Sequence, residues 1–222
     1  PTTLGEGGVG FIPTYAQLFV DLMMHPERVQ RQRLRELAAA AETPEHRGLA
    51  AFLKLKHGAR SEDPERITAD GRRWAKSLAK GHPGMASRML RETALVHLSE
   101  GQLPAALKDA KRALDLSRKA VEADEDEITE QLLSQTTLGS PRRLSQTEVD
   151  AAITYSAALV YSGAITEAAD LAGGMARRCV LADRPRGAAS FLTNQAIALH
   201  RLGNRPEANI CVAEARTLHH RH

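Results

Sequence analysis

A phrase of helix-forming residues that ends in a glycine, with an alanine five residues further on, occurs three times in this chain. It reads LVHLSEGQLPAAL at 95–107, ALVYSGAITEAA at 158–169 and IALHRLGNRPEAN at 197–209. A glycine commonly ends a helix because it adopts the left-handed conformation without steric cost. A small residue lets two helices approach closely. The phrase therefore predicts repeated pairs of helices joined by tight turns.

The composition supports a helical fold. Only 4% of the 222 residues are aromatic, while Ala and Leu are abundant. Strands favour β-branched and aromatic residues, whereas helices favour Ala, Leu, Glu, Lys, Gln and Arg. A chain of this length can bury a sizeable core, either as one domain or as one continuous stack of repeats. We therefore expect an all-α protein.

Prolines and capping residues predict where several helices begin. Pro26, Pro44 and Pro64 suit the first turn of a helix, where the missing N–H would be unpaired anyway. Thr43 precedes Pro44 and Asp63 precedes Pro64, and both are good capping residues. A cap at Ser145 or Thr147, with Glu148, starts another helix. The expected helices cover 14–24, 26–42, 44–58, 64–81, 85–100, 104–137 (one long helix, or two split near residue 124), 147–162, 165–182, 187–202 and the residues from 206 onwards.

The repeated phrase resembles the tetratricopeptide repeat, a helix–turn–helix with small residues at the helix crossing and a period near 34 residues. Met175 departs from the motif, and its usual aromatics and closing proline are absent. The intervals between the three glycines are 62 and 40 residues, and the second is similar to the repeats of the helical sensor regions in bacterial signal-transducing ATPases and LuxR-type regulators. The matching positions are Ala94, Gly101, Ala106 and Ala113; Ser156, Gly163, Ala168 and Met175; and Ala196, Gly203, Ala208 and Ala215.

This resemblance implies a right-handed superhelix of antiparallel helix pairs. Residues 83–222 would form the tetratricopeptide-like repeats, and residues 13–82 would be divergent helix pairs at their N-terminal side. Residues 1–12 contain four glycines and read as a flexible linker into the fold, because no strand precedes them as a phosphate-binding loop would require. We interpret the chain as an excised domain of a larger protein.

A stack of helix pairs presents the first helix of each pair on a concave surface, and such grooves bind peptides, protein segments or small ligands. The resemblance implies which side chains face the groove. Asn194 is similar to the Asn with which tetratricopeptide domains hold a peptide carboxylate, and an Arg fork suits the same group. The candidate binding residues are Arg88, Arg91, Asp150, Thr154, Thr193 and Asn194.

Our first hypothesis is a non-catalytic module that binds a protein or peptide, as the sensor or interaction domain of a bacterial transcriptional regulator. We expect a cytoplasmic protein without a membrane span, since no apolar run of 18 residues occurs. Cys179 and Cys211 are expected to be reduced and buried. Sensing of a small-molecule ligand and formation of a homodimer are further alternatives.

The second hypothesis is a nucleic-acid-associated helical domain with an arginine-rich face. Arginines recur at 28, 31, 33 and 35, and again at 72 and 73. Acidic residues at 27, 36, 42 and 45 lie among them, as on an ordinary solvated helix. The formal net charge of +3 is too small to imply nucleic acid. Direct contact with nucleic acid is therefore the weaker expectation.

An enzyme is the third hypothesis, for which scattered histidines are the only motivation. No HExxH, GxSxG or P-loop motif occurs. We interpret His97 and His200 as packing residues. The acidic run 122–130 lacks the spacing and glycine of a calcium loop. We expect no catalytic residue, no metal site and no cofactor.

Overall fold

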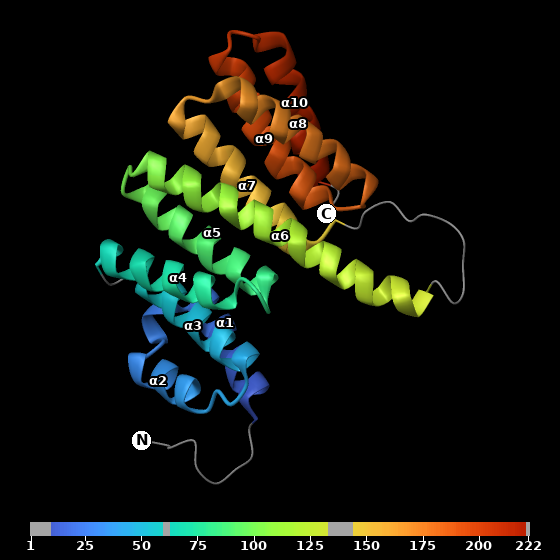
Figure 1. Cartoon of the computed structure of the whole chain (residues 1–222). Coiled ribbons are helices and arrows are strands. Elements are labelled where there is room, and N and C mark those ends of the chain that lie inside the picture. The colour runs from blue at the N-terminus through green and yellow to red at the C-terminus, as the bar shows by residue number, and fades with distance from the viewer. Residues whose placement is uncertain (1–9, 60–62, 133–143, 221–222) are drawn as a thin grey trace.

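The computed structural model describes residues 10–59, 63–132 and 144–220, and these are almost entirely helical. The helices follow one another along the molecule in chain order (Figure 1). Their bounds are α1 Phe11–Met24, the short 3₁₀ helix Pro26–Arg28, α2 Arg31–Ala39, α3 Pro44–Gly58, α4 Pro64–Leu78, α5 Pro83–Ser99, α6 Leu103–Leu132, α7 Gln146–Ser162, α8 Ile165–Leu181, α9 Pro185–Arg201 and α10 Arg205–His220.

The expected helix starts are confirmed where a cap and a proline coincide. Thr43 accepts a hydrogen bond from the His46 N–H over 3.1 Å at the start of α3. Asp63 accepts one from Glu65 N–H at the start of α4, and Ser145 caps α7 through Glu148 N–H. These local side-chain acceptors satisfy N–H groups that have no partner within the helix.

The N-terminal helices differ from the expectation. Pro26 opens only a 3₁₀ turn, and α2 begins five residues later at Arg31. Val29 interrupts the two with an extended backbone and a buried side chain. Phe11 and Ile12, which we assigned to the linker, are already part of α1. Residues 1–9, the rest of the expected linker, lie outside the described residues.

Helix α6 is a single helix of 30 residues, so its expected splitting near residue 124 is wrong. In Figure 1 its C-terminal half extends beyond the neighbouring helices. The predicted break at 138–141 lies outside the described residues. A long α6 accounts in part for the wide interval between the first two repeated glycines.

All three glycines of the repeated phrase adopt positive φ, at 70°, 87° and 82° for Gly101, Gly163 and Gly203. The same turn occurs a fourth time, between α8 and α9, where Asp183 has a φ of 50°. Its neighbours make the same hydrogen bonds: Arg184 N–H donates to Cys179 O over 2.8 Å, as Ala164 N–H donates to Leu159 O over 3.0 Å. The turns at 163, 183 and 203 are therefore spaced by 20 residues.

The small residues of the motif are buried where helices cross. Ala106, Ala113 and Ala168 are fully buried, and Ala208 and Ala215 are 5% exposed. Ala94, Ser156 and Ala196 in the preceding helices are buried as well. Ala188, five residues after Asp183, is equally buried, so the fourth turn carries the complete phrase apart from its glycine. Tight helix crossings thus use the positions that the motif predicted.

Helices α5, α7 and α9 pack side by side, and each contacts the helix that follows it in the chain. Most of the buried apolar side chains form one cluster that runs from α3 to α10, across residue 82. A smaller cluster joins α1, α2 and α3, with Leu18, Leu37 and Leu53 fully buried or nearly so. Helix α3 contributes to both clusters, with Phe52 in the first and Leu53 in the second. It therefore connects the N-terminal helices to the stack.

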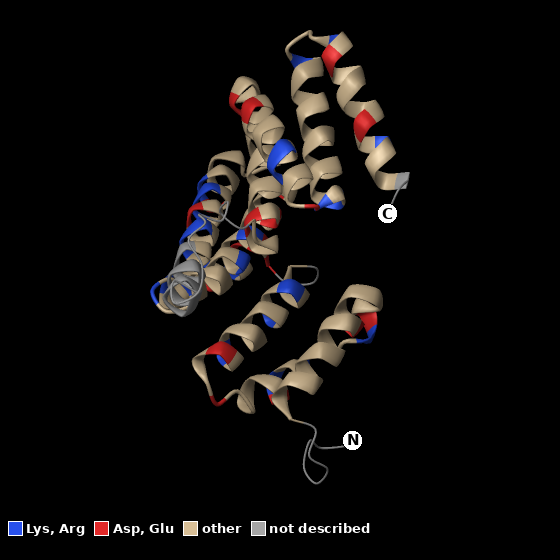
Figure 2. Cartoon of the chain, turned by 90° about the vertical axis from the view of Figure 1, so that its right-hand side faces the viewer, with Lys and Arg blue, Asp and Glu red and all other residues tan. Residues whose placement is uncertain are grey.

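Lys and Arg lie among Asp and Glu on most of the helices (Figure 2). None of the helices over the described ranges has both the length and the apolar composition that a membrane span needs.

Candidate functional site

The predicted groove residues on α5 and α7 contact each other. Arg91 Nη1 lies 2.9 Å from Asp150 Oδ2, and its Nη2 lies 2.5 Å from Oε1 of Glu92. Thr154 Oγ1 donates to the Asp150 carbonyl oxygen. Arg88 is exposed, and its charge acts on Tyr15 of α1. The Arg91 guanidinium is therefore already paired with carboxylates of this chain.

The predicted residues on α9 also bond within the protein. Asn194 Nδ2 donates to Ser156 Oγ over 2.6 Å and lies 3.4 Å from the Ile153 carbonyl oxygen, both on α7. Thr193 Oγ1 donates to Ala189 O one turn earlier on its own helix. The Asn194 amide thus joins two first helices of the stack, and a ligand would have to displace these bonds.

Three buried carboxylates bridge successive helices. Glu92 of α5 lies 3.3 Å from Lys56 Nζ of α3. Asp109 of α6 pairs with Arg72 of α4 over 2.9 Å. Glu148 of α7 is fully buried and pairs with Arg178 of α8 over 2.8 Å. Buried charges of this kind require a partner, so these residues position the helices.

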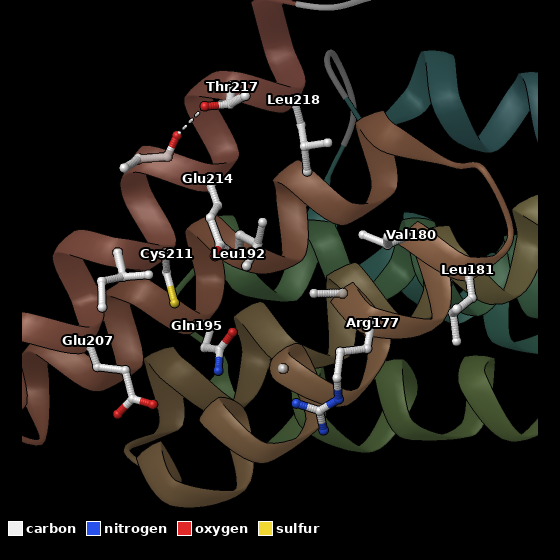
Figure 3. A pocket seen from close by; sticks show the side chains of 14 residues that line it. Arg177, Val180, Leu181, Leu192, Gln195, Glu207, Cys211, Glu214, Thr217 and Leu218 are labelled. Atoms are coloured by element: carbon white, nitrogen blue, oxygen red, sulfur yellow. Dashed lines mark hydrogen bonds between the residues drawn. The ribbon is translucent and has the colours of Figure 1, made fainter.

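A groove of about 820 Å³ lies between α8 and α10 (Figure 3). Leu192 and Gln195 of α9 form its floor. Arg177, Val180 and Leu181 stand on the α8 side, while Glu207, Ile210, Cys211, Glu214, Thr217 and Leu218 stand on the α10 side. None of the six residues predicted to bind a ligand lines this groove.

Small residues keep the groove open. Gly173 and Ala176 on α8 and Ala213 on α10 line it. A Cβ atom at Gly173 would lie 2.7 Å from the Gln195 Nε2, so a larger residue there would meet the floor. Because α8 and α10 present such short side chains, they leave a space above α9 that neither fills.

The groove is bordered by apolar side chains that face solvent. Leu181 is 88% exposed, Val180 58% and Ile210 57%. The floor residues Leu192 and Cys211 are buried. Exposed apolar residues gathered along one groove mark an interaction surface more often than singly scattered ones do.

The charges on the two sides of the groove differ in sign. Arg177 stands on α8, and Glu207 and Glu214, separated by two helical turns, stand on α10. Burial raises the pKa of the Cys211 thiol, and the Glu214 and Glu207 carboxylates raise it further. Cys211 is therefore a protonated, apolar part of the groove wall at neutral pH rather than a nucleophile.

Sequence reasoning missed this groove because its two walls are distant in the chain. The available signal was the apolar pair at 180 and 181, which continues past the buried face of α8. That signal shows only that the side chains are exposed. The pairing of α8 with α10 across α9 requires the tertiary structure.

The arginines of the second hypothesis do not form one face. Arg33 pairs with Asp21 over 3.3 Å, and Arg72 with Asp109. Arg73 pairs with Asp70. Arg31 and Arg35 instead line a separate recess between α2, α3 and α4.

The two histidines differ in their surroundings. His97 is buried as expected, with its Nδ1 at 2.6 Å from Gln102 Oε1. His200 is exposed, so its assignment as a packing residue is wrong. Cys179 and Cys211 are buried free thiols, as expected. Within the described part of the chain, no three His, Cys, Asp or Glu side chains are grouped as metal ligands.

Comparison with known proteins adds no assignment. No protein-family model matches the chain, and neither a curated protein nor a solved structure does.

Proposed function

We propose that this protein is a non-catalytic, tetratricopeptide-like interaction module, and that the groove between α8 and α10 binds an amphipathic helix of a partner protein. The observation that carries the proposal is the open apolar groove of about 820 Å³. An amphipathic helix commonly binds by laying its apolar face into such a groove.

The dimensions of the groove suit a helix. Its residues on α10 run from Glu207 to Leu218, a separation of 11 residues that corresponds to about 16 Å along a helix axis. That length matches about three turns of a bound helix, which would place apolar anchors at positions i, i+3 or i+4, and i+7. The walls and floor are themselves helices, so ridges of a bound helix can pack between them.

The charges specify the partner further. A helix in the groove would place one flank near Glu207 and Glu214 and the other near Arg177. Basic residues on the first flank and an acidic residue on the second would complement these charges. Such pairs at the rim contribute mainly to specificity and to the rate of association.

The repeated turns and the side-by-side packing of α5, α7 and α9 support a superhelical arrangement of the tetratricopeptide kind. The place of the module in a bacterial transcriptional regulator in the cytoplasm stays a prediction from the resemblance. Peptide binding by Arg91 and Asn194 stays a second prediction, which the groove proposal does not need.

Selection from a displayed library of 18-residue helices tests the groove. The library keeps apolar residues at i, i+3, i+4 and i+7 and randomises both flanks. We expect enriched peptides to carry Lys or Arg on one flank, and fluorescence anisotropy with the best peptide to show at least tenfold weaker binding to Ile210→Asp. The matched control is Val20→Asp, since Val20 is similarly exposed at 54% but lies on α1.

The proposal fails if no peptide is enriched, or if Ile210→Asp binds the selected peptide as well as the control does. Sedimentation of the unliganded protein distinguishes a second copy as the occupant. A dimer that the Ile210→Asp change dissociates would show that the groove is an interface between copies of this chain.

A further inference from the structure

A second recess, of about 300 Å³, lies among α2, α3 and α4 and is lined mainly by basic side chains. Arg31 and Arg35 come from successive turns of α2, Lys54 and His57 from one face of α3, and Arg66 from the first turn of α4. Leu34 and Ala38 complete the lining. None of the described residues that line the recess is acidic.

The cations of this recess differ from most others near the stack. Arg33, Arg72 and Arg91 each pair with an aspartate of a neighbouring helix. Arg35, Lys54 and Arg66 make no ion pair or side-chain hydrogen bond within the described part of the chain. Like charges held near one another repel, so an anion bound among them would relieve that repulsion.

The recess also has a defined wall. His57 Nε2 donates a hydrogen bond to the Val29 carbonyl oxygen over 3.1 Å, which orients the imidazole ring. Leu34 is buried and belongs to the smaller core cluster, so the apolar side of the recess is held by packing. The basic side chains therefore surround a surface that is partly apolar and partly cationic.

We propose that this recess binds a small phosphorylated molecule. Planar guanidinium groups match the oxygens of a phosphate in pairs, and the lysine ammonium adds a point charge. Leu34 and Ala38 would contact an apolar part of the same ligand. A volume of about 300 Å³ is at the lower end of the range for small-molecule sites, and a compact ligand fits it better than a polymer does.

Calorimetric titration with pyrophosphate and with phenyl phosphate tests the recess directly. We expect saturable binding of one equivalent, and at least a tenfold loss of affinity in Arg35→Glu and in Lys54→Glu. Both residues are exposed, so circular dichroism should show an unchanged fold. The control is Lys76→Glu, an exposed residue of α4 outside the recess that makes the same change in net charge.

Phenyl phosphate should bind more tightly than inorganic phosphate, because the ring reaches the apolar wall. Absence of saturable binding by either probe overturns the proposal, as does an equal loss of affinity in Lys76→Glu. Binding of a 20-nucleotide single strand that Arg35→Glu abolishes, without binding of pyrophosphate or phenyl phosphate, would assign the recess to nucleic acid instead.

Discussion

Asn194 of α9 donates a hydrogen bond over 2.6 Å to Ser156 of α7. The resemblance implied a ligand-binding role for Asn194 and a crossing position for Ser156, and the structure joins the two. Ser156 Oγ in turn donates to the Ile153 carbonyl oxygen over 3.0 Å. This short chain of hydrogen bonds holds successive first helices of the stack against each other.

Replacing Asn194 with Ala should therefore lower stability. We expect the free energy of unfolding to fall by about 1–2 kcal/mol, because a hydrogen bond is lost and a buried hydroxyl loses its donor. Urea unfolding measures the change. Thr193→Ala is the control and should change stability by less than about 0.5 kcal/mol, since Thr193 is exposed and bonds only its own helix. An unchanged midpoint for Asn194→Ala would show that the bond to α7 contributes nothing.

Removing the carboxylate of Glu148 should destabilise the protein more strongly. Glu148 is fully buried between Arg178 and Arg118. Glu148→Ala leaves both cations without this partner, and breaking a buried pair costs about 3–5 kcal/mol; the partial exposure of both arginines places our expectation at the lower end. Chemical denaturation provides the measurement. Glu214→Ala, at an exposed position, should stay close to wild type, and comparable losses for the two variants would contradict the argument.

The left-handed turns allow a pair of opposite predictions. Gly163→Ala should cost about 1 kcal/mol, because a Cβ atom disfavours positive φ. Asp183→Gly should instead raise the free energy of unfolding by a few tenths of a kcal/mol to about 1 kcal/mol, since Asp183 occupies the same conformation at φ 50°. Thermal unfolding of both variants checks the two signs. A destabilised Asp183→Gly would mean that the Asp183 side chain contributes more than its backbone strain costs.

Helix α4 approaches α5 closely at Gly71. A Cβ atom there would lie 2.3 Å from the Thr93 Cγ2 and 3.2 Å from two methyl carbons of Leu55. Gly71→Ala should cost about 1–3 kcal/mol through overpacking. Gly174→Ala is the matched control: it lies inside α8 with no atom within 4 Å of the added Cβ, and should stabilise by about 0.4–1 kcal/mol. Equal effects of the two changes in a urea titration would refute the close approach.

Stability should decrease in strongly alkaline solution through Tyr155. Burial and the hydrogen bond from its hydroxyl to Glu167 raise the pKa of Tyr155 to about 12, from an ordinary value of 10.0. Between pH 10 and 12 the unfolded chain loses this proton while the folded chain retains it. The contribution is therefore complete below pH 10 and is lost as the pH rises through 12. Unfolding midpoints measured from pH 9 to 12 should fall less steeply in Tyr155→Phe, and parallel curves would exclude this origin.

Much of the fold was predictable because its signals are local. Thr43 with Pro44 placed the start of α3, and Ser145 with Glu148 placed that of α7. The glycines at 101, 163 and 203 marked three turns. Failures occurred where another interaction decided the conformation: Val29 packs into the core and separates Pro26 from α2, and Asp183 adopts a turn that its residue type does not announce.

The candidate sites were less predictable. The motif indicated which residues belong to the first helices, but Arg91 and Asn194 bond to neighbouring helices of the same chain. The α8–α10 groove and the basic recess combine residues from three helices each. Helical periodicity indicates which face of one helix is apolar. It carries no information on how far apart two other helices stand.

The amino-acid sequence by itself determined the all-α class, most helix boundaries, the three glycine turns and the small residues at the crossings. Each of these follows from backbone sterics or from capping by residues within one turn. Only the tertiary structure decided which charges pair, which apolar side chains remain exposed beside the groove, and which cations gather around the recess. Those outcomes depend on distances between helices far apart in the chain, and these distances are set by the packing of the whole stack.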